Sequence, residues 1–151
     1  MNKYMKLALN EAKKAYKLKE VPVGAIIVKD DKVIARAYNL REKTNNAISH
    51  AEILCINKAC KKLKSWRLDG CEMYITLEPC LMCAGAIAQS RISKIVIGAM
   101  DPKNGCVGSK ANVLDINITN KVEYIYELED ECSNILKEFF KELRETKKTL
   151  K

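Results

Sequence analysis

Four residues of this chain have side chains and a spacing that suit metal chemistry. His50 is the only histidine among the 151 residues, and Glu52 follows it two positions later in the segment SHAEIL. Cys80 and Cys83 lie three residues apart in LEPCLMC, where a proline precedes the first cysteine. If a helix begins there, both thiols point to one side of it, and the positive N-terminus favours the thiolate that a metal needs.

One imidazole and two thiolates would provide three ligands for zinc. Structural zinc sites are usually closed by four protein ligands, whereas catalytic zinc keeps a fourth position for water, whose pKa falls to roughly 7. Glu52 would then act as the base and acid that moves protons between this water and the substrate. The order H-x-E followed by P-C-x-x-C is the arrangement found in zinc-dependent nucleobase deaminases.

Simpler interpretations of the same residues also exist. Ser49 and Glu52 fit a capping box at a helix start, which would leave His50 an incidental polar residue. The cysteine pair could belong to a redox motif or to a structural zinc site, which would need a fourth ligand. None of the remaining cysteines forms a second close pair, and we interpret them as small buried residues or free thiols: Cys55, Cys60, Cys71, Cys106 and Cys132. The two motifs together therefore favour catalytic zinc.

The composition is typical of one folded domain, with 48% hydrophobic and 30% charged residues. No apolar run approaches the roughly 18 residues of a membrane span, and the N-terminal segment lacks the apolar core of a signal peptide. Seven cysteines, an odd number, indicate thiols or metal ligands rather than a complete set of disulfides. We expect a cytoplasmic protein without a membrane segment, with a single domain over residues 1–151.

The net charge of +8 suits a polyanionic partner, although a coding bias toward Lys, Asn and Ile would produce the same excess. The C-terminal segment places Phe139 and Phe140, whose rings can receive unstacked bases, among several cations. These cations are Lys137, Lys141, Arg144, Lys147, Lys148 and Lys151. The alternative is that the phenylalanines belong to the core and the lysines face solvent.

Hydrophobic patterning predicts four helices and five strands. The helices are expected over residues 3–19, 50–63, 80–90 and 130–148, and the strands over 23–29, 32–38, 72–77, 94–98 and 122–127. Asp30-Asp31 should turn a hairpin, Pro79 should occupy a first helical turn, and the strand–helix–strand unit over 72–98 should be parallel. The result is a mixed sheet with helices on both faces. Helix N-termini then face one crevice, which would collect His50 and the cysteine pair.

The chain resembles the cytidine deaminase superfamily and, within it, is most similar to bacterial tRNA adenosine deaminases. The resemblance runs from about residue 4 to about residue 145 and is most specific over residues 77–109. Further matching segments are VPVGAIIV at 21–28, YN at 38–39, HAE at 50–52 and WRL at 66–68. It implies a three-layer α/β/α sandwich with a five-stranded mixed sheet, a homodimer, and conversion of the wobble adenosine of an arginine tRNA to inosine.

The resemblance also implies roles for individual residues. The family's zinc ligands and proton shuttle match His50, Cys80, Cys83 and Glu52. Asn39 matches an asparagine that hydrogen-bonds the flipped adenine, and Asp101 and Lys103 match a loop that lines the RNA site. The chain departs from the family at NNAIS, residues 45–49, and in a segment over 115–121 that looks shortened. These departures bear on RNA contacts or the dimer edge, and not on the zinc chemistry.

Two other functions fit parts of the sequence. A deaminase of a free base or nucleoside, such as guanine or cytosine, needs the same zinc site but no basic surface. A non-catalytic binding module stabilised by zinc has no use for a carboxylate that is not a ligand, so Glu52 argues against it. Turnover of any substrate would exclude the binding module.

Overall fold

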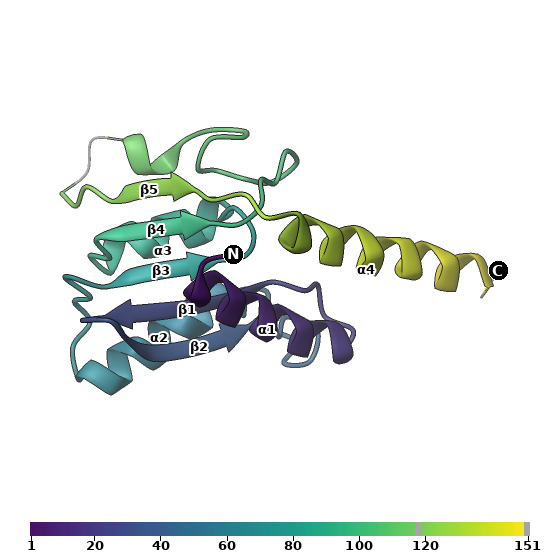
Figure 1. Ribbon diagram of the computed structural model, residues 1–151, viewed down its shortest axis with the longest axis horizontal. Coiled ribbons are helices and arrows are strands. Elements are labelled where there is room, and N and C mark those ends of the chain that lie inside the picture. Colours follow the sequence, from purple (N-terminus) through teal and green to yellow (C-terminus); the bar gives the residue numbers. More distant parts are fainter. Residues whose placement is uncertain (117–118, 150–151) are drawn as a thin grey trace.

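The described part of the chain forms a five-stranded sheet in the order β2-β1-β3-β4-β5 (Figure 1). The computed structural model describes residues 1–116 and 119–149. The strands are β1 (Gly24–Lys29), β2 (Lys32–Tyr38), β3 (Glu72–Ile75), β4 (Lys94–Ile97) and β5 (Glu123–Tyr126). β1 pairs antiparallel with β2 and with β3, whereas β3, β4 and β5 pair in parallel. The predicted hairpin, the parallel pair and the mixed sheet are therefore confirmed.

Helices cover both faces of this sheet. In the described residues they are α1 (Lys3–Lys17), α2 (Ala51–Leu63), α3 (Leu81–Gln89) and α4 (Asp130–Thr149), with a 3-10 turn, η1 (Val113–Asp115). α2 and α3 pack on one face, and α1 packs on the other, where Cys132 and Ile135 from the first two turns of α4 join it. The rest of α4 extends beyond the sheet (Figure 1). This is the three-layer sandwich that the sequence predicted. Among the described residues, no helix combines the length and the hydropathy needed to cross a bilayer.

β1 is an interior strand of the sheet, between β2 and β3, and its residues alternate between the two faces. Ala25 and Ile27 pack in the cluster beneath α2 and α3, whereas Ile26 and Val28 pack in the cluster beneath α1. Successive side chains of a strand point to opposite faces, so a strand covered on both sides needs an uninterrupted apolar run. The segment GAIIV meets that need.

Gly24, at the start of β1, allows α1 to pack directly on the strand. A Cβ atom at this position would overlap the backbone of Ala8 and Ala12. The Gly24 N–H also donates to Thr76 Oγ1 at 3.1 Å, just beyond the end of β3. Glycine is therefore required for close helix–strand contact beside the segment that leads to the cysteine pair.

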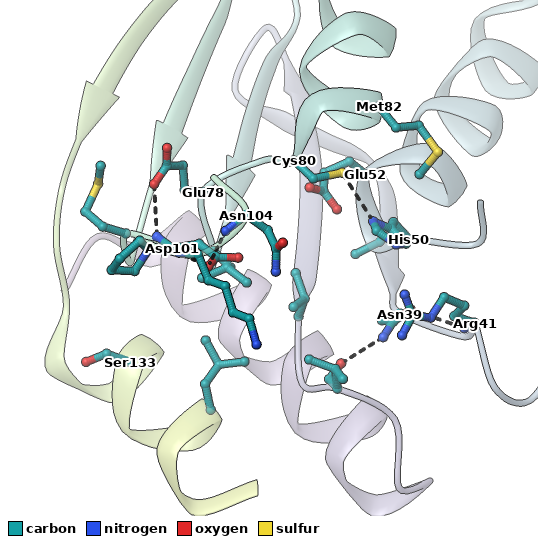
Figure 2. Close-up of a pocket in the computed structure, with 18 of the residues that line it drawn as sticks. Asn39, Arg41, His50, Glu52, Glu78, Cys80, Met82, Asp101, Asn104 and Ser133 are labelled. Atoms are coloured by element: carbon teal, nitrogen blue, oxygen red, sulfur yellow. Dashed lines mark hydrogen bonds between the residues drawn. The ribbon is translucent and has the colours of Figure 1, made fainter. Parts of the chain in front are cut away.

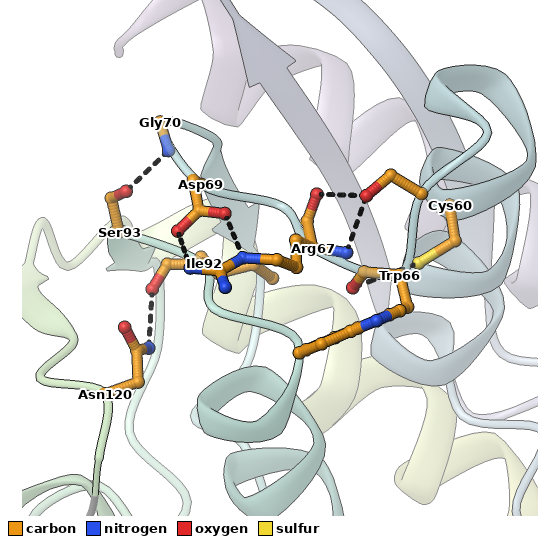
Figure 3. Close-up of polar contacts among 9 residues, drawn as sticks. Cys60, Trp66, Arg67, Asp69, Gly70, Ile92, Ser93 and Asn120 are labelled. Carbon is orange, nitrogen blue, oxygen red and sulfur yellow. Dashed lines mark hydrogen bonds and ion pairs between the residues drawn. The ribbon is translucent and has the colours of Figure 1, made fainter.

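The amino ends of the parallel strands are joined by polar contacts between their loops (Figure 3). The Gly70 N–H donates to Ser93 Oγ at 2.8 Å, and Asn120 Nδ2 donates to the Ile92 carbonyl at 3.3 Å. Trp66, from the WRL segment, is 60% exposed at this end. These contacts join the loops at the amino ends of β3, β4 and β5. The candidate functional residues lie at the opposite edge of the sheet, at the carboxyl ends of the strands.

All seven cysteines are described, and none forms a disulfide. Cys55, Cys71 and Cys132 are buried, while Cys60 and Cys106 are partly exposed. Burial raises the pKa of Cys55 and raises that of Cys132 to about 12, so both remain protonated thiols. The prediction of thiols rather than disulfides is confirmed. Lys151 and part of the segment 115–121, both considered above, lie outside the described residues.

Candidate active site

The ends of two strands bring the histidine and the cysteines to one edge of the sheet. β2 and β3 both run antiparallel to β1, so their carboxyl ends lie on the same side. The chain leaves β2 toward His50 and leaves β3 toward Cys80. Each residue is the N-cap of the helix that follows, with an extended backbone and no capping hydrogen bond from its side chain. Both side chains are therefore free to turn toward each other (Figure 2).

These helix starts correct two details of the sequence prediction. The capping box is wrong, because α2 begins at Ala51 with His50 as its N-cap, and Ser49 lies one residue too early to cap it. Pro79 likewise precedes the Cys80 N-cap of α3 instead of occupying the first turn. A capping pattern locates a helix start only to within a residue or two. Here the shift places His50 at the N-cap, where its imidazole makes no capping hydrogen bond and is free to bind a metal.

His50, Cys80 and Cys83 place three ligand atoms within 4.8 Å of one another. The Nδ1 atom of His50 lies 3.7 Å from Cys80 Sγ and 3.6 Å from Cys83 Sγ. In a tetrahedral zinc site, bonds of about 2.0–2.1 Å to nitrogen and 2.3 Å to sulfur place these atoms roughly 3.6 Å apart. The cluster can therefore hold a metal ion, and its donor set and spacing fit zinc.

The protonation of this cluster favours metal binding. Hydrogen bonds from Cys83 and His50 lower the pKa of Cys80 to about 4, despite burial. The hydrogen bond with Cys80, together with burial, raises the pKa of Cys83 above that of a free thiol. A hydrogen bond to Cys80 also raises the pKa of His50. Cys80 is thus already a thiolate, and a metal would displace the proton of Cys83.

Glu52 lies in the first turn of α2, beside His50 and Cys80 (Figure 2). Its side chain is 4% exposed, and burial raises its pKa to about 7. The nearby Cys80 thiolate adds to this rise, whereas a hydrogen bond with Cys83 opposes it. A carboxyl group with a pKa near neutrality can both accept and donate a proton, as general acid–base catalysis requires.

A pocket of about 900 Å³ opens above this cluster. It is lined by Val21, Val23, Asn39, Arg41, His50, Ala51, Glu52, Leu77, Glu78, Cys80, Leu81, Met82, Met100, Asp101, Pro102, Lys103, Asn104, Ser133, Leu136, Lys137 and Phe140. The volume lies near the upper end of the roughly 300–1,000 Å³ found for ligand pockets. Of the seven residues named from the sequence, six line the pocket, and Cys83 lies in the cluster with His50 and Cys80.

Comparison with known proteins identifies the family. Residues 1–144 match the family model described as MafB19-like deaminase. The chain is 51% identical over 147 residues to the tRNA-specific adenosine deaminase of Bacillus subtilis (strain 168), covering 96% of this chain and 91% of that protein. The chain belongs to the tRNA-specific adenosine deaminase family.

Solved structures agree with this assignment. A structure from work on A-to-I editing by tRNA:A34 deaminases superposes with a TM-score of 0.83 at 42% identity, covering 88% of this chain and 98% of the other. A guanine deaminase from Bacillus subtilis superposes with a TM-score of 0.62 at 38% identity, covering 66% of each chain. The chain thus has the fold of these deaminases. The match covers more of the first structure than of the guanine deaminase.

In this member of the adenosine deaminase family, two hydrogen bonds orient Asn39 at the pocket wall (Figure 2). Its side chain is 7% exposed. The Nδ2 atom donates to the Val21 carbonyl at 3.2 Å, and Oδ1 accepts the Arg41 N–H at 3.1 Å. An amide has two donor hydrogens and two acceptor sites, so one of each remains for a ligand.

Asp101 and Lys103 lie on the opposite wall, in a loop that follows β4. Asp101 Oδ1 accepts the N–H groups of Lys103 and Asn104 at 3.2 and 3.1 Å, so this carboxylate shapes the loop's own turn. The Lys103 side chain is exposed at the pocket rim. The two residues therefore differ: Asp101 maintains the loop, and Lys103 offers a cation to a ligand.

The two phenylalanines of α4 also differ. Phe139 is 9% exposed and packs edge-on against Tyr16, with 5.9 Å between ring centroids. Phe139 is therefore a core residue. Phe140 is 41% exposed and lines the pocket with Lys137. An exposed aromatic ring beside a cation at a pocket mouth can stack on a nucleobase. The interpretation of these rings as a base-stacking surface therefore suits Phe140 alone.

Arg41 and Glu78 are site residues that the sequence analysis missed. Arg41 is exposed and follows Asn39 by two positions, so it adds a third cation to the rim beside Lys103 and Lys137. Glu78 is a buried carboxylate immediately before the cysteine motif. In the sequence, the available signal for Glu78 was a charged residue between an apolar strand and Pro79. Because Glu78 is buried, its carboxylate must accept hydrogen bonds from the protein itself.

Proposed function

We propose that this chain is a zinc-dependent hydrolase that deaminates adenosine to inosine at the wobble position of tRNA, the first anticodon nucleotide. The substrate we propose is an arginine tRNA with the anticodon ACG. The observation that carries this proposal is the three-ligand cluster beside buried Glu52, at the base of a pocket rimmed by cations. The kinship with tRNA-specific adenosine deaminases supports the choice of substrate.

Zinc would be held by His50, Cys80 and Cys83, whose nitrogen and sulfur donors suit this metal. When bound, it would activate a water molecule for attack at neutral pH. Three protein ligands leave room for that water, and Glu52 lies where it can reach it. The exposed pocket side of the cluster is where a base would enter.

Glu52 performs the proton transfers. As the water oxygen bonds to C6 of adenine, Glu52 accepts a proton from the water and delivers it to N1. It then passes the second proton of the water to the exocyclic nitrogen. The C6–N bond breaks, ammonia leaves and C6 retains the oxygen as the carbonyl of inosine. A pKa near 7 allows the same carboxyl group to serve in both steps.

The walls of the pocket bind the nucleotide. Asn39 offers one donor and one acceptor to the edge of the flipped base, and Phe140 offers its ring to a neighbouring base. Arg41, Lys103 and Lys137 face the phosphates. A loop adenosine is already partly unstacked, so extruding it costs less than the few kcal/mol or so needed from a duplex.

The active form we propose is a cytoplasmic homodimer. Two large apolar side chains are exposed within two positions of proposed metal ligands: Ile48 is 54% exposed and Leu81 is 66% exposed. Contact with a second copy would remove them from water. Sedimentation equilibrium of the purified protein tests this: a dimer supports the proposal, and a monomer at micromolar concentration contradicts it.

The experiment that tests the substrate is inosine detection after incubation with an anticodon hairpin bearing ACG. The matched control hairpin carries guanosine at the first anticodon position. Free guanine and cytidine are assayed in parallel, and hairpin binding is measured at two salt concentrations. We expect inosine only from the ACG hairpin, with binding that weakens steeply as salt increases, because phosphate contacts release counterions.

The second candidate is a deaminase of free bases, which the similarity to a guanine deaminase favours. It would use the same cluster and Glu52 but not the cationic rim. Faster turnover of free guanine or cytidine than of the hairpin, or hairpin binding that is indifferent to salt, would replace the tRNA proposal with this one.

A further inference from the structure

Glu78 is a buried carboxylate whose hydrogen-bonding capacity is completely used. Oε1 accepts the Asp101 N–H at 2.9 Å and the Ser109 hydroxyl at 2.5 Å. Oε2 accepts the Val107 N–H at 3.0 Å and the Ser109 N–H at 2.9 Å. A carboxylate has about four acceptor positions, and these four donors fill them. Glu78 therefore has none left for a metal, a water or a substrate.

All four donors belong to one loop, residues 101–109. A backbone hydrogen bond from the Cys106 N–H to the Pro79 carbonyl, at 2.9 Å, joins the loop to the same segment. Gly105 packs against the carboxylate so closely that a Cβ atom there would overlap it. The loop thus surrounds the Glu78 side chain, two residues before Cys80. Figure 2 shows its contact with Asp101.

This loop is also a wall of the pocket. Asp101, Lys103 and Asn104 line it, opposite Asn39. The loop has little regular structure of its own, since it joins β4 to η1 with a single isolated bridge between Val107 and Asn112. Its shape therefore depends on individual hydrogen bonds. Some form within the loop and one comes from the Tyr126 hydroxyl, while the Glu78 carboxylate accepts four.

We propose that Glu78 is a positioning residue that fixes the 101–109 loop as the RNA-facing wall of the pocket and thereby sets affinity for the tRNA substrate. This inference rests on the proposed function. Glu78 contributes to the Michaelis constant through the loop and leaves the proton transfers to Glu52. Its position in the LEPC segment means that one short stretch of chain holds both the metal site and the substrate wall.

Glutamine at position 78 would keep the shape of the side chain but disrupt its hydrogen bonds to the loop. Its amide offers only one oxygen, and its NH₂ group would face backbone N–H groups on whichever side it lies. The three backbone N–H groups that donate to Glu78 cannot act as acceptors. At least one hydrogen bond is therefore lost, and the new NH₂ group is left facing an N–H donor. Glu78→Gln therefore disturbs the loop without a change of side-chain volume.

The experiment compares wild type with Glu78→Gln by steady-state kinetics on the ACG hairpin and by amide hydrogen exchange. We expect the KM to rise roughly tenfold, with kcat changed by less than about threefold and zinc content unchanged. Exchange should accelerate at the amides of Asp101, Val107 and Ser109. Unchanged exchange in the loop, or a loss confined to kcat, would overturn the proposal.

Gly105→Ala tests the same contact from the loop side and covers the case in which Glu78→Gln folds poorly. The added methyl group would displace the carboxylate, so this variant should show the same rise in KM and the same faster exchange. Ser109→Ala, which removes only the hydroxyl donor, should give a smaller effect of the same kind. A normal KM in well-folded Gly105→Ala would contradict the proposal.

Two other buried glutamates provide matched controls. Glu20 accepts the N–H groups of Glu42 and Lys43 at 3.0 and 2.6 Å, on the opposite side of the pocket. Glu20→Gln should accelerate exchange there and not in the 101–109 loop. Glu11, which pairs with Lys14 on α1, touches neither loop, and Glu11→Gln should leave KM unchanged. A rise in KM in Glu11→Gln equal to that in Glu78→Gln would show a general effect and overturn the proposal.

Hydrogen exchange also separates this inference from the proposed function. Exchange in the 101–109 loop is measured without substrate, so it reports positioning even if wild-type protein makes no inosine from the hairpin. Absence of inosine with wild type would contradict the tRNA substrate. Normal loop exchange in Glu78→Gln, with active wild type, would contradict the role of Glu78 alone.

Discussion

The Nδ1 atom of His50 lies 3.6 Å from the Sγ atom of Cys83, although 33 positions separate the two residues in the chain. This distance is what a shared tetrahedral zinc ion requires. It arises because α2 and α3 cover the same face of the sheet and begin at the same edge. The candidate metal cluster is therefore a contact between two helix N-termini, and its integrity should be linked to that of the fold.

The first prediction concerns the metal. Purified protein should contain one zinc per chain, measured by elemental analysis, and Cys83→Ala should lose it. Because metal binding and folding are linked, we expect the Tm of this variant to fall by about 5 °C or more. Cys60→Ala, at a partly exposed cysteine outside the cluster, is the control and should retain zinc. Freshly prepared wild-type protein without zinc would contradict the assignment.

The second prediction separates metal binding from chemistry at Glu52. Glu52→Gln should keep its zinc, because the carboxylate is not one of the three proposed ligands. Inosine formation should fall by a factor of roughly 10²–10⁴, which is typical for loss of a general acid–base group. The measurement pairs single-turnover kinetics with metal analysis of the same sample. Loss of zinc in this variant would mean that Glu52 is a ligand, and near-normal turnover would remove it from the mechanism.

The third prediction concerns base recognition by Asn39. Asn39→Ala removes the remaining donor and acceptor that face the pocket, as well as the bonds to Val21 and Arg41. We expect kcat/KM for the hairpin to fall by roughly 10-fold or more, with zinc retained. Asn46→Ala, in the same loop but outside the pocket lining, controls for loop destabilisation. Equal losses in both variants would make Asn39 a purely structural residue.

The fourth prediction assigns different roles to neighbouring aromatic residues on α4. Phe140→Ala should weaken hairpin binding by the roughly 1–3 kcal/mol of a stacked base, with little change in Tm. Phe139→Ala should do the reverse, lowering Tm through loss of core packing against Tyr16. Leu143→Ala, with similar exposure to Phe140 but outside the pocket lining, is the control for binding. Equal binding losses in Phe140→Ala and Leu143→Ala would remove the stacking role.

Some features of this protein follow from local residue chemistry and were predictable from the chain. The hairpin at Asp30-Asp31 is one, because both residues adopt the positive φ values that a tight hairpin turn needs and aspartate tolerates. The candidate ligands are another. A histidine and two cysteines at expected helix starts carry their chemistry in their type and spacing, whatever the surrounding fold.

Other features depend on which parts of the chain pack together. Phe139 and Phe140 are adjacent and identical in type, so only the placement of α4 against α1 decides which ring is buried. In the sequence Glu78 is an ordinary charged residue, and only the folded structure shows that the 101–109 loop donates hydrogen bonds to its carboxylate. Burial and long-range hydrogen bonds are relations between distant segments, and local patterns do not contain them.

The sequence by itself determined the candidate donor atoms, the candidate proton-transfer group and the order of helices and strands, because these depend on residue type and short-range periodicity. Only the tertiary structure decided that the carboxyl ends of β2 and β3 meet at one edge, since that follows from both strands pairing with β1. The same pairing decided that Asn39 faces the loop of Asp101 across one pocket. A site assembled from strand ends exists only once the sheet has formed.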